Sequence, residues 1–261
     1  MRPLFLMTND DGIFSPGLAA AIAAVRNLGE LLIVAPRFQQ TTMGRSFPHF
    51  HHTGIIESVS LEIQGKPVPA YSVDGSPAQA VAHAILELAG RKPDLCISGI
   101  NYGANIGLSL TCSGTVGAAF EADSHGIRSI AISRQTPLDW QRTEAYPDTD
   151  WSDSQQGLAE IIQSILADGF APDVNILNVN VPDQPARPLR IRLTRQSRFS
   201  DSVFVKPGTR DKGRPFQLAA KLNEDYSGVG KDSDAYVLYI EKAISVTPLT
   251  WDLTAGFVPS G

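Results

Sequence analysis

A short apolar strand, a polar loop and a helix that begins at Ser-Pro recur along this chain, and this repetition limits the fold more than any other feature. Residues 4–7 are apolar and lead into a loop that ends at Ser15-Pro16, where an Ala-rich helix extends to about Leu28. Serine is a favoured N-cap and proline a favoured first helical residue, so this dipeptide marks where the helix starts. The apolar residues 31–34 predict a second buried strand, which completes a β-α-β unit and implies parallel strands.

The same pattern continues through the first two thirds of the chain. A strand over residues 71–73 precedes Ser76-Pro77 and a helix that extends to about residue 89. Further strands are predicted at 94–98, 129–133 and 175–181, and further helices at 115–124 and 155–166. This alternation predicts an α/β fold, with a doubly wound, mostly parallel sheet over residues 1–185.

The composition changes after about Arg187. Polar, Arg- and Lys-bearing segments with several glycines follow, and then residues 235–240 and 243–246 show strand-like alternation. We predict that residues 186–261 form an appended C-terminal β-rich region within the same structural unit.

Composition and charge exclude several classes of protein. Hydrophobic residues make up 43% and charged residues 19% of the chain, which is typical of a globular protein. The net charge is −5, and without a Lys/Arg run a nucleic-acid duplex is not an expected partner. Two cysteines, Cys96 and Cys112, are too few for a disulfide framework. With neither a signal-peptide pattern nor an apolar run of membrane-spanning length, we expect a cytoplasmic protein without membrane association.

Polar residues gather where the predicted strands end. Asp10 and Asp11 follow the first strand, Thr41 lies in the loop after the second, and Asn101 follows the strand that ends near residue 98. In doubly wound sheets the ligand crevice lies just beyond the carboxyl ends of the strands. Adjacent carboxylates repel each other unless a cation lies between them, and hard divalent ions prefer oxygen ligands. These four residues therefore predict a metal site. The alternative is that one Asp caps a turn before Gly12 and the other is merely solvated.

A second group of residues indicates phosphate binding. Ser113, Gly114 and Thr115 place small side chains and free N–H groups at a helix start, a geometry that binds phosphate. Further substrate-binding candidates lie beside the metal set: Asn9, Thr42 and Asn105. The alternatives are an ordinary N-cap at Ser113 and a simple turn in the Asn- and Gly-rich loop. No dinucleotide fingerprint, Walker loop or serine-hydrolase elbow is present in the sequence.

Several motifs in this order resemble the SurE family of survival-protein nucleotidases. They are Thr8-Asn9-Asp10-Asp11-Gly12, Val34-Ala35-Pro36, Asp74-Gly75-Ser76-Pro77-Ala78, Ser98-Gly99-Ile100-Asn101-Tyr102-Gly103 and Ser113-Gly114-Thr115-Val116-Gly117-Ala118-Ala119. The resemblance spans nearly the whole chain. It implies a Rossmann-like fold and a metal-dependent nucleotidase that hydrolyses nucleoside 5′- or 3′-monophosphates with Mg or Mn, one ion per subunit, and in some members polyphosphate. It also implies a homodimer or homotetramer built by exchange of C-terminal arms.

The resemblance assigns the metal ligands and identifies one departure from the family pattern. Asp10, Asp11 and Asn101 match family ligands, and we predict them as catalytic. The fourth ligand, usually a serine followed by glycine, corresponds to Thr41 followed by Thr42. Threonine keeps the hydroxyl but is stiffer, and the loss of the glycine removes conformational freedom. The alternative function is therefore a non-catalytic nucleotide or phosphate sensor with an impaired metal site.

Overall fold

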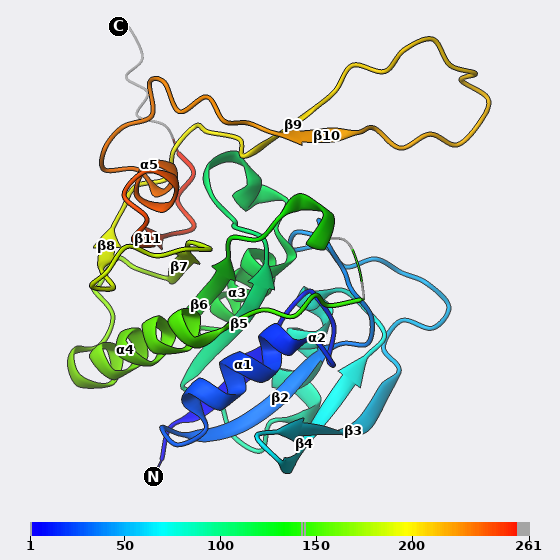
Figure 1. Cartoon of the computed structure of the whole chain (residues 1–261). Helices are drawn as coiled ribbons and strands as arrows, with labels where there is room; N and C mark the ends of the chain where they lie inside the picture. The colour runs from blue at the N-terminus through cyan, green and yellow to red at the C-terminus, as the bar shows by residue number, and fades with distance from the viewer. Residues whose placement is uncertain (1, 142, 144, 255–261) are drawn as a thin grey trace, which may run out of the picture.

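A nine-stranded sheet runs through the part of the chain that the computed structural model describes, residues 2–141, 143 and 145–254 (Figure 1). The strands are β1 (Leu4–Thr8), β2 (Glu30–Pro36), β3 (Ile56–Ile63), β4 (Lys66–Val73), β5 (Leu95–Tyr102), β6 (Ser129–Arg134), β7 (Ile176–Val181), β8 (Ile191–Leu193) and β11 (Ile244–Leu249). Their order is β3-β4-β2-β1-β5-β6-β7-β11-β8. The strands from β4 to β7 are parallel, whereas β3 and β11 run antiparallel to β4 and β7. The predicted α/β fold with a mostly parallel sheet is confirmed.

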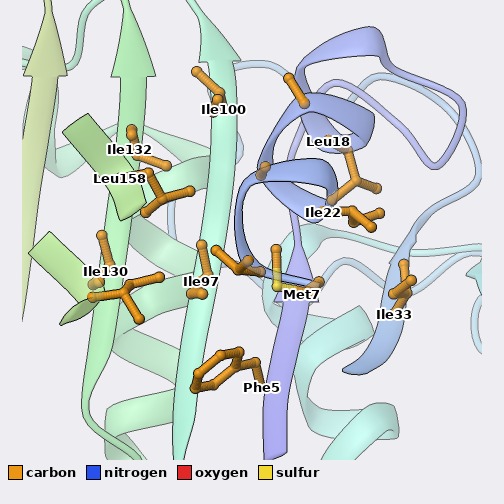
Figure 2. Packing of buried hydrophobic residues seen from close by; sticks show 14 of the residues in the cluster. Phe5, Met7, Leu18, Ile22, Ile33, Ile97, Ile100, Ile130, Ile132 and Leu158 are labelled. Carbon is orange, nitrogen blue, oxygen red and sulfur yellow. The ribbon is translucent and has the colours of Figure 1, made fainter. Parts of the chain in front are cut away.

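Helices cover both faces of the sheet. They are α1 (Pro16–Val25), α2 (Pro77–His83), α3 (Gly114–Ser124), α4 (Ser152–Asp168) and α5 (Asp234–Tyr239). Figure 2 shows the core under α1 and α4, where Phe5 and Met7 of β1 lie with Leu18, Ile22 and Leu158. A second cluster, which includes Val81 of α2 and Ala118 of α3, packs on the opposite face against Leu6. β1 is thus buried on both faces, as its uninterrupted apolar sequence predicts.

Both predicted Ser-Pro helix starts are confirmed. Ser15 accepts a hydrogen bond from the Gly17 N–H, and Ser76 forms a capping box with Gln79. α1 ends at Val25 rather than near Leu28, because residues 26–29 turn into β2. α2 is followed directly by a π-helical turn, Ala84–Leu88.

One predicted element is wrong. Residues 235–240 were predicted as a strand, but the structure has helix α5 there. Ser233 caps this helix by accepting a hydrogen bond from the Tyr236 N–H, and the Asp234 carboxylate accepts another from the Ser197 N–H. A segment of six residues is too short for its hydrophobic period to separate helix from strand, so the capping serine was the better signal.

The C-terminal region both completes the sheet and extends away from it. β11 pairs with β7, and β8 pairs with β11. By contrast, β9 (Ser202–Phe204) and β10 (Ala220–Leu222) form a two-stranded antiparallel arm that projects from the body in Figure 1. The division at residue 185 stays a prediction. No helix in the described ranges is long and apolar enough to cross a membrane.

Candidate active site

The polar residues predicted at the strand ends meet where the order of the sheet reverses. The chain moves outward from β1 to β2 and β4, then returns to place β5 on the other side of β1. Asp10 and Asp11 follow β1, and Asn101 lies near the end of β5. The two strands are in register, with Thr8 opposite Ser98. Ligands bind at such a reversal because the loops diverge there and leave a crevice.

Asp10 is buried against the start of α3. The Thr115 hydroxyl donates a hydrogen bond of 2.7 Å to Oδ1 of Asp10. A Cβ on Gly114 would lie 2.8 Å from Oδ2 of Asp10, so only glycine allows this close approach. The helix start that the sequence predicted as a phosphate site therefore lies directly beside the first carboxylate.

Asp11 faces the end of β5. Its Oδ2 accepts a hydrogen bond of 3.0 Å from the Tyr102 N–H, and its Oδ1 accepts one of 3.1 Å from Nε2 of Gln39. The Tyr146 hydroxyl donates to the Asp11 carbonyl at 2.7 Å. Both the side chain and the backbone of Asp11 are thus fixed by groups from three separate segments.

The two carboxyl groups are held in an environment that disfavours their charge. Burial raises the pKa of Asp10, and the Thr115 hydrogen bond opposes this shift. Burial also raises the pKa of Asp11, and the neighbouring charge of Asp10 raises it further. Asp10 is 4% and Asp11 1% exposed. A cation between the two groups would relieve both penalties, so the burial and charge of the pair fit a bound metal ion.

Asn101 directly precedes Tyr102, whose N–H donates to the Asp11 carboxylate. The Asn101 Nδ2 donates to the Gly103 carbonyl at 2.7 Å, which leaves Oδ1 as the free acceptor of that amide. No group of three or more His, Cys, Asp or Glu side chains in the described chain could hold a metal ion. A site here would instead combine two carboxylates with amide and hydroxyl oxygens, which suits a hard ion such as Mg²⁺ or Mn²⁺ and not a thiolate-seeking one.

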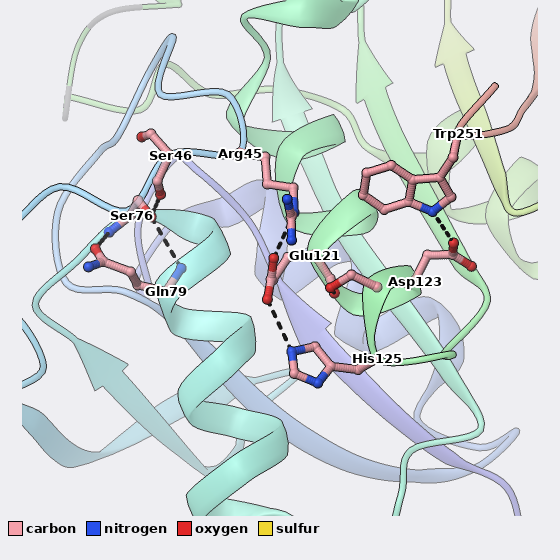
Figure 3. A network of polar contacts seen from close by, with 9 residues as sticks. Arg45, Ser46, Ser76, Gln79, Glu121, Asp123, His125 and Trp251 are labelled. Carbon is pink, nitrogen blue, oxygen red and sulfur yellow. Dashed lines mark hydrogen bonds and ion pairs between the residues drawn. The ribbon is translucent and has the colours of Figure 1, made fainter. Parts of the chain in front are cut away.

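The loop that carries Thr41 is held between α2 and α3 (Figure 3). Arg45 forms an ion pair of 2.7 Å with Glu121 of α3, and Nε2 of Gln79 in α2 donates to the Pro48 carbonyl. The Gln40 N–H donates to the Asp10 carbonyl at 2.7 Å, which fixes the near end of the loop. Thr41 is therefore carried next to Asp10 by a loop tied down at several points.

Thr42 occupies a backbone conformation that suits glycine. Its φ is 64°, in the left-handed region that β-branched residues rarely adopt, and its side chain is exposed. The sequence resemblance implies a glycine at this position, and a threonine here carries backbone strain that a glycine would not.

Three of the predicted binding residues make contacts within the chain. Asn9 is fully buried, and its Nδ2 donates to the Gly12 carbonyl, which shapes the turn around the carboxylates. Its Oδ1 is buried without a hydrogen-bond partner in the described structure. Asn105 donates to the hydroxyls of Thr115 and Ser133, so it supports the residue that contacts Asp10. Ser113 is the N-cap of α3 and accepts from the Val116 N–H.

Sequence reasoning missed Gln39 and Tyr146. Gln39 lies two residues before Thr41, and its loop position gave no sign that its amide reaches Asp11. Tyr146 comes from the connection between β6 and α4, for which no element was predicted. Only the folded chain brings these residues to Asp11, and neither belongs to a local motif.

The fold and site together define an open α/β protein with adjacent buried carboxylates at the reversal point of its sheet. The family model described as "Survival protein SurE" matches residues 5–202, and the chain belongs to this family. It is 38% identical over 252 residues to the 5′-nucleotidase SurE of Thermococcus gammatolerans, covering 96% of this chain and 91% of that protein. The 5′-nucleotidase SurE of Archaeoglobus fulgidus is 37% identical over 252 residues, with 96% and 92% covered.

A solved structure shows the same architecture. The crystal structure of the SurE protein from Aquifex aeolicus superposes with a TM-score of 0.76 at 29% identity, covering 97% of this chain and 95% of that one. The shared fold therefore includes the C-terminal region as well as the central sheet.

Proposed function

We propose that this chain is a 5′-nucleotidase that hydrolyses nucleoside monophosphates with the help of one divalent metal ion per subunit. The observation that carries this proposal is the buried Asp10–Asp11 pair beside the N-terminus of α3, because it joins a cation site to an anion site. The names of the curated relatives support the reaction.

The proposed metal ligands are Asp10, Asp11, Asn101 through Oδ1, and Thr41 through its hydroxyl. A bound Mg²⁺ or Mn²⁺ would supply Lewis-acid activation of water and of the phosphoryl group. Within the chain, Thr115 orients Asp10, whereas Gln39 and the Tyr102 N–H orient Asp11. These contacts fix the carboxylates before substrate arrives, which lowers the cost of organising the site during the reaction.

The start of α3 is the proposed phosphate-binding element. Ser113 caps this helix, and Gly114 and Thr115 of its first turn lie directly against the Asp10 carboxylate. A helix N-terminus stabilises negative charge, and this stabilisation increases as charge develops on the phosphoryl oxygens. In this proposal Asn105 orients Thr115, and Asn9 shapes the turn that carries the two carboxylates. Thr42 is exposed in the loop that follows β2 and is the further proposed substrate contact.

The decisive experiment measures phosphate release from nucleoside 5′- and 3′-monophosphates and polyphosphate, with Mn²⁺, Mg²⁺ or EDTA. Asp10→Asn keeps an acceptor for Thr115 but removes a ligand charge, and we expect it to lower kcat/KM at least ~100-fold. Asp173→Asn is the matched control, because Asp173 is exposed and precedes β7, at the end of the strands opposite to the carboxyl ends that carry the site. Nucleotide binding without phosphate release under any condition would favour the sensor.

We also propose that the protein assembles as a homodimer or homotetramer through its C-terminal arm. The arm around β9 and β10 projects from the body and carries exposed apolar side chains, including Phe204 at 68% exposure and Phe216 at 49%. Apolar groups gathered on a projecting segment are typical of a protein interface.

A further inference from the structure

A large pocket lies beside α3, between this helix and the C-terminal segment around β11. Its volume is about 640 Å³, within the range of small-molecule sites. Its walls are mainly apolar and aromatic, with Leu110, Phe120, Leu249 and Trp251 among them. None of the residues proposed above as metal ligands lines this pocket, although Ser113 of the proposed phosphate site does.

The pocket begins where the proposed phosphate site ends. Ser113, Gly117 and Phe120 lie along one stripe of α3 and line the pocket. The neighbouring residues Gly114 and Thr115 contact Asp10 instead. Since one turn of helix spans about 5.4 Å, the Ser113 end of the pocket lies within about one turn of Gly114 and Thr115.

The side chains that line the pocket suit an uncharged aromatic group better than a chain of phosphates. The pocket contains two arginines, Arg45 and Arg195, but the Arg45 guanidinium is already paired with Glu121 at 2.7 Å. A chain of phosphates would need several free cations, which these walls do not provide. An uncharged aromatic base on a sugar would instead bury its faces against apolar and aromatic side chains.

Trp251 is held in position to form one wall. Its indole N–H donates to Asp123 of α3 (Figure 3). Its ring packs edge-on against Phe120 with centroids 4.8 Å apart, and the Arg45 guanidinium lies 5.3 Å from its centroid. The side chain is still 43% exposed. An aromatic ring that is fixed by three contacts and still partly exposed loses little further entropy when a base packs on it.

We propose that this pocket binds the nucleoside part of the substrate, with Trp251 as its main aromatic contact. The proposal rests on the proposed nucleotidase function and adds a substrate preference to it. Phosphomonoesters with an aromatic base should be favoured over inorganic polyphosphate and over small aliphatic esters.

The test compares wild type, Trp251→Ala and Trp251→Phe. We expect Trp251→Ala to lower the ratio of kcat/KM for adenosine 5′-monophosphate to kcat/KM for glycerol phosphate about tenfold, mainly through KM. Trp251→Phe should restore most of the ratio, because it keeps an aromatic face. Phe170→Ala is the matched control, since Phe170 is another partly exposed aromatic beneath an arginine, Arg128, but follows α4 and lies outside this pocket.

A second measurement separates this proposal from the proposed activity. Adenosine binding is measured by calorimetry in EDTA, where no hydrolysis takes place. Binding that weakens about tenfold in Trp251→Ala would support the pocket even if wild type released no phosphate. Equal losses for both esters, or adenosine binding unchanged by Trp251→Ala, would overturn the assignment.

Discussion

Thr42 has a backbone conformation that its own side chain disfavours. A left-handed conformation costs a residue with a Cβ about 1–2 kcal/mol, whereas glycine adopts it freely. Thr42→Gly should therefore raise the free energy of unfolding by up to about 1 kcal/mol, once the greater chain entropy of glycine is subtracted. Chemical denaturation measures this change. Thr42→Ala is the control, since alanine keeps the strain, and an equal gain in both variants would contradict the explanation.

The two carboxyls should make the effect of metal depend on pH. Burial raises the pKa of both groups, so in metal-free protein their contribution to stability is greatest below the ordinary carboxyl pKa of about 4 and is lost as pH rises through the raised values. Metal binds the deprotonated carboxylates, so its affinity increases over the same range. We expect Mn²⁺ to raise the melting temperature more at about pH 8 than at about pH 5.5.

Thermal melts with Mn²⁺ or EDTA at both pH values test this expectation. Asp10→Asn should flatten the dependence, because it leaves one ionisable carboxyl without a charged neighbour. An increment in melting temperature that is the same at both pH values would show that these carboxyls do not bind the ion.

At the residue level, the sequence predicted which residues come together at the strand ends but not the contacts that they make. Asp10, Asp11 and Asn101 could be found because parallel strands bring their carboxyl ends to one edge. Gln39 and Tyr146 could not, because their approach to Asp11 depends on how two long connections fold back over the sheet. The hydrogen bond from the Asn105 amide to Thr115 could not be predicted either, because it depends on how the loop after β5 folds.

The packing of α3 against the loop of Thr41 depends on Gly117. A Cβ at this position would lie 2.2 Å from the Gly44 carbonyl, which is backbone and cannot rotate away. Gly117→Ala should therefore displace the loop, lower stability by about 1–3 kcal/mol and weaken metal binding about tenfold, although alanine is the better helix former.

Gly157 of α4 provides the matched control for this change. A Cβ there would meet the Cδ1 atom of Ile244, the end of a flexible side chain that can rotate. Gly157→Ala should cost less stability and leave metal affinity intact. Calorimetric Mn²⁺ titration and melting of both variants measure the difference, and equal metal affinities would show that the loop contact does not control the site.

Helices and strands could be predicted where a long apolar pattern or a clear capping motif was present in the sequence. The buried parallel strands and the Ser-Pro helices satisfy this condition. The β3–β4 hairpin was largely missed because its two-residue turn is Gln64-Gly65, in which Gln64 takes an unexpected positive φ of 50°. The strand predicted at 235–240 was wrong because α5 is shorter than two turns.

At the scale of the whole molecule, the C-terminal region has two parts with different roles. β11 pairs with β7, whose residues are mostly buried, whereas the arm of β9 and β10 pairs only within itself in the described structure. A chain that ends at residue 185 would leave the inner strand β7 as an unpaired edge, which favours aggregation. It should therefore fail to give a cooperative melting transition.

Excision of the arm should have the opposite result. Joining residue 202 to residue 222 through a short Gly-Ser linker removes mostly exposed residues and leaves β11 in the sheet. We expect a cooperative melt close to that of wild type, together with a smaller oligomer in light scattering if the arm builds the assembly. An arm-deleted chain that keeps the wild-type mass would refute the arm as the interface, while a folded chain of residues 1–185 would show that the catalytic domain is independent of β11.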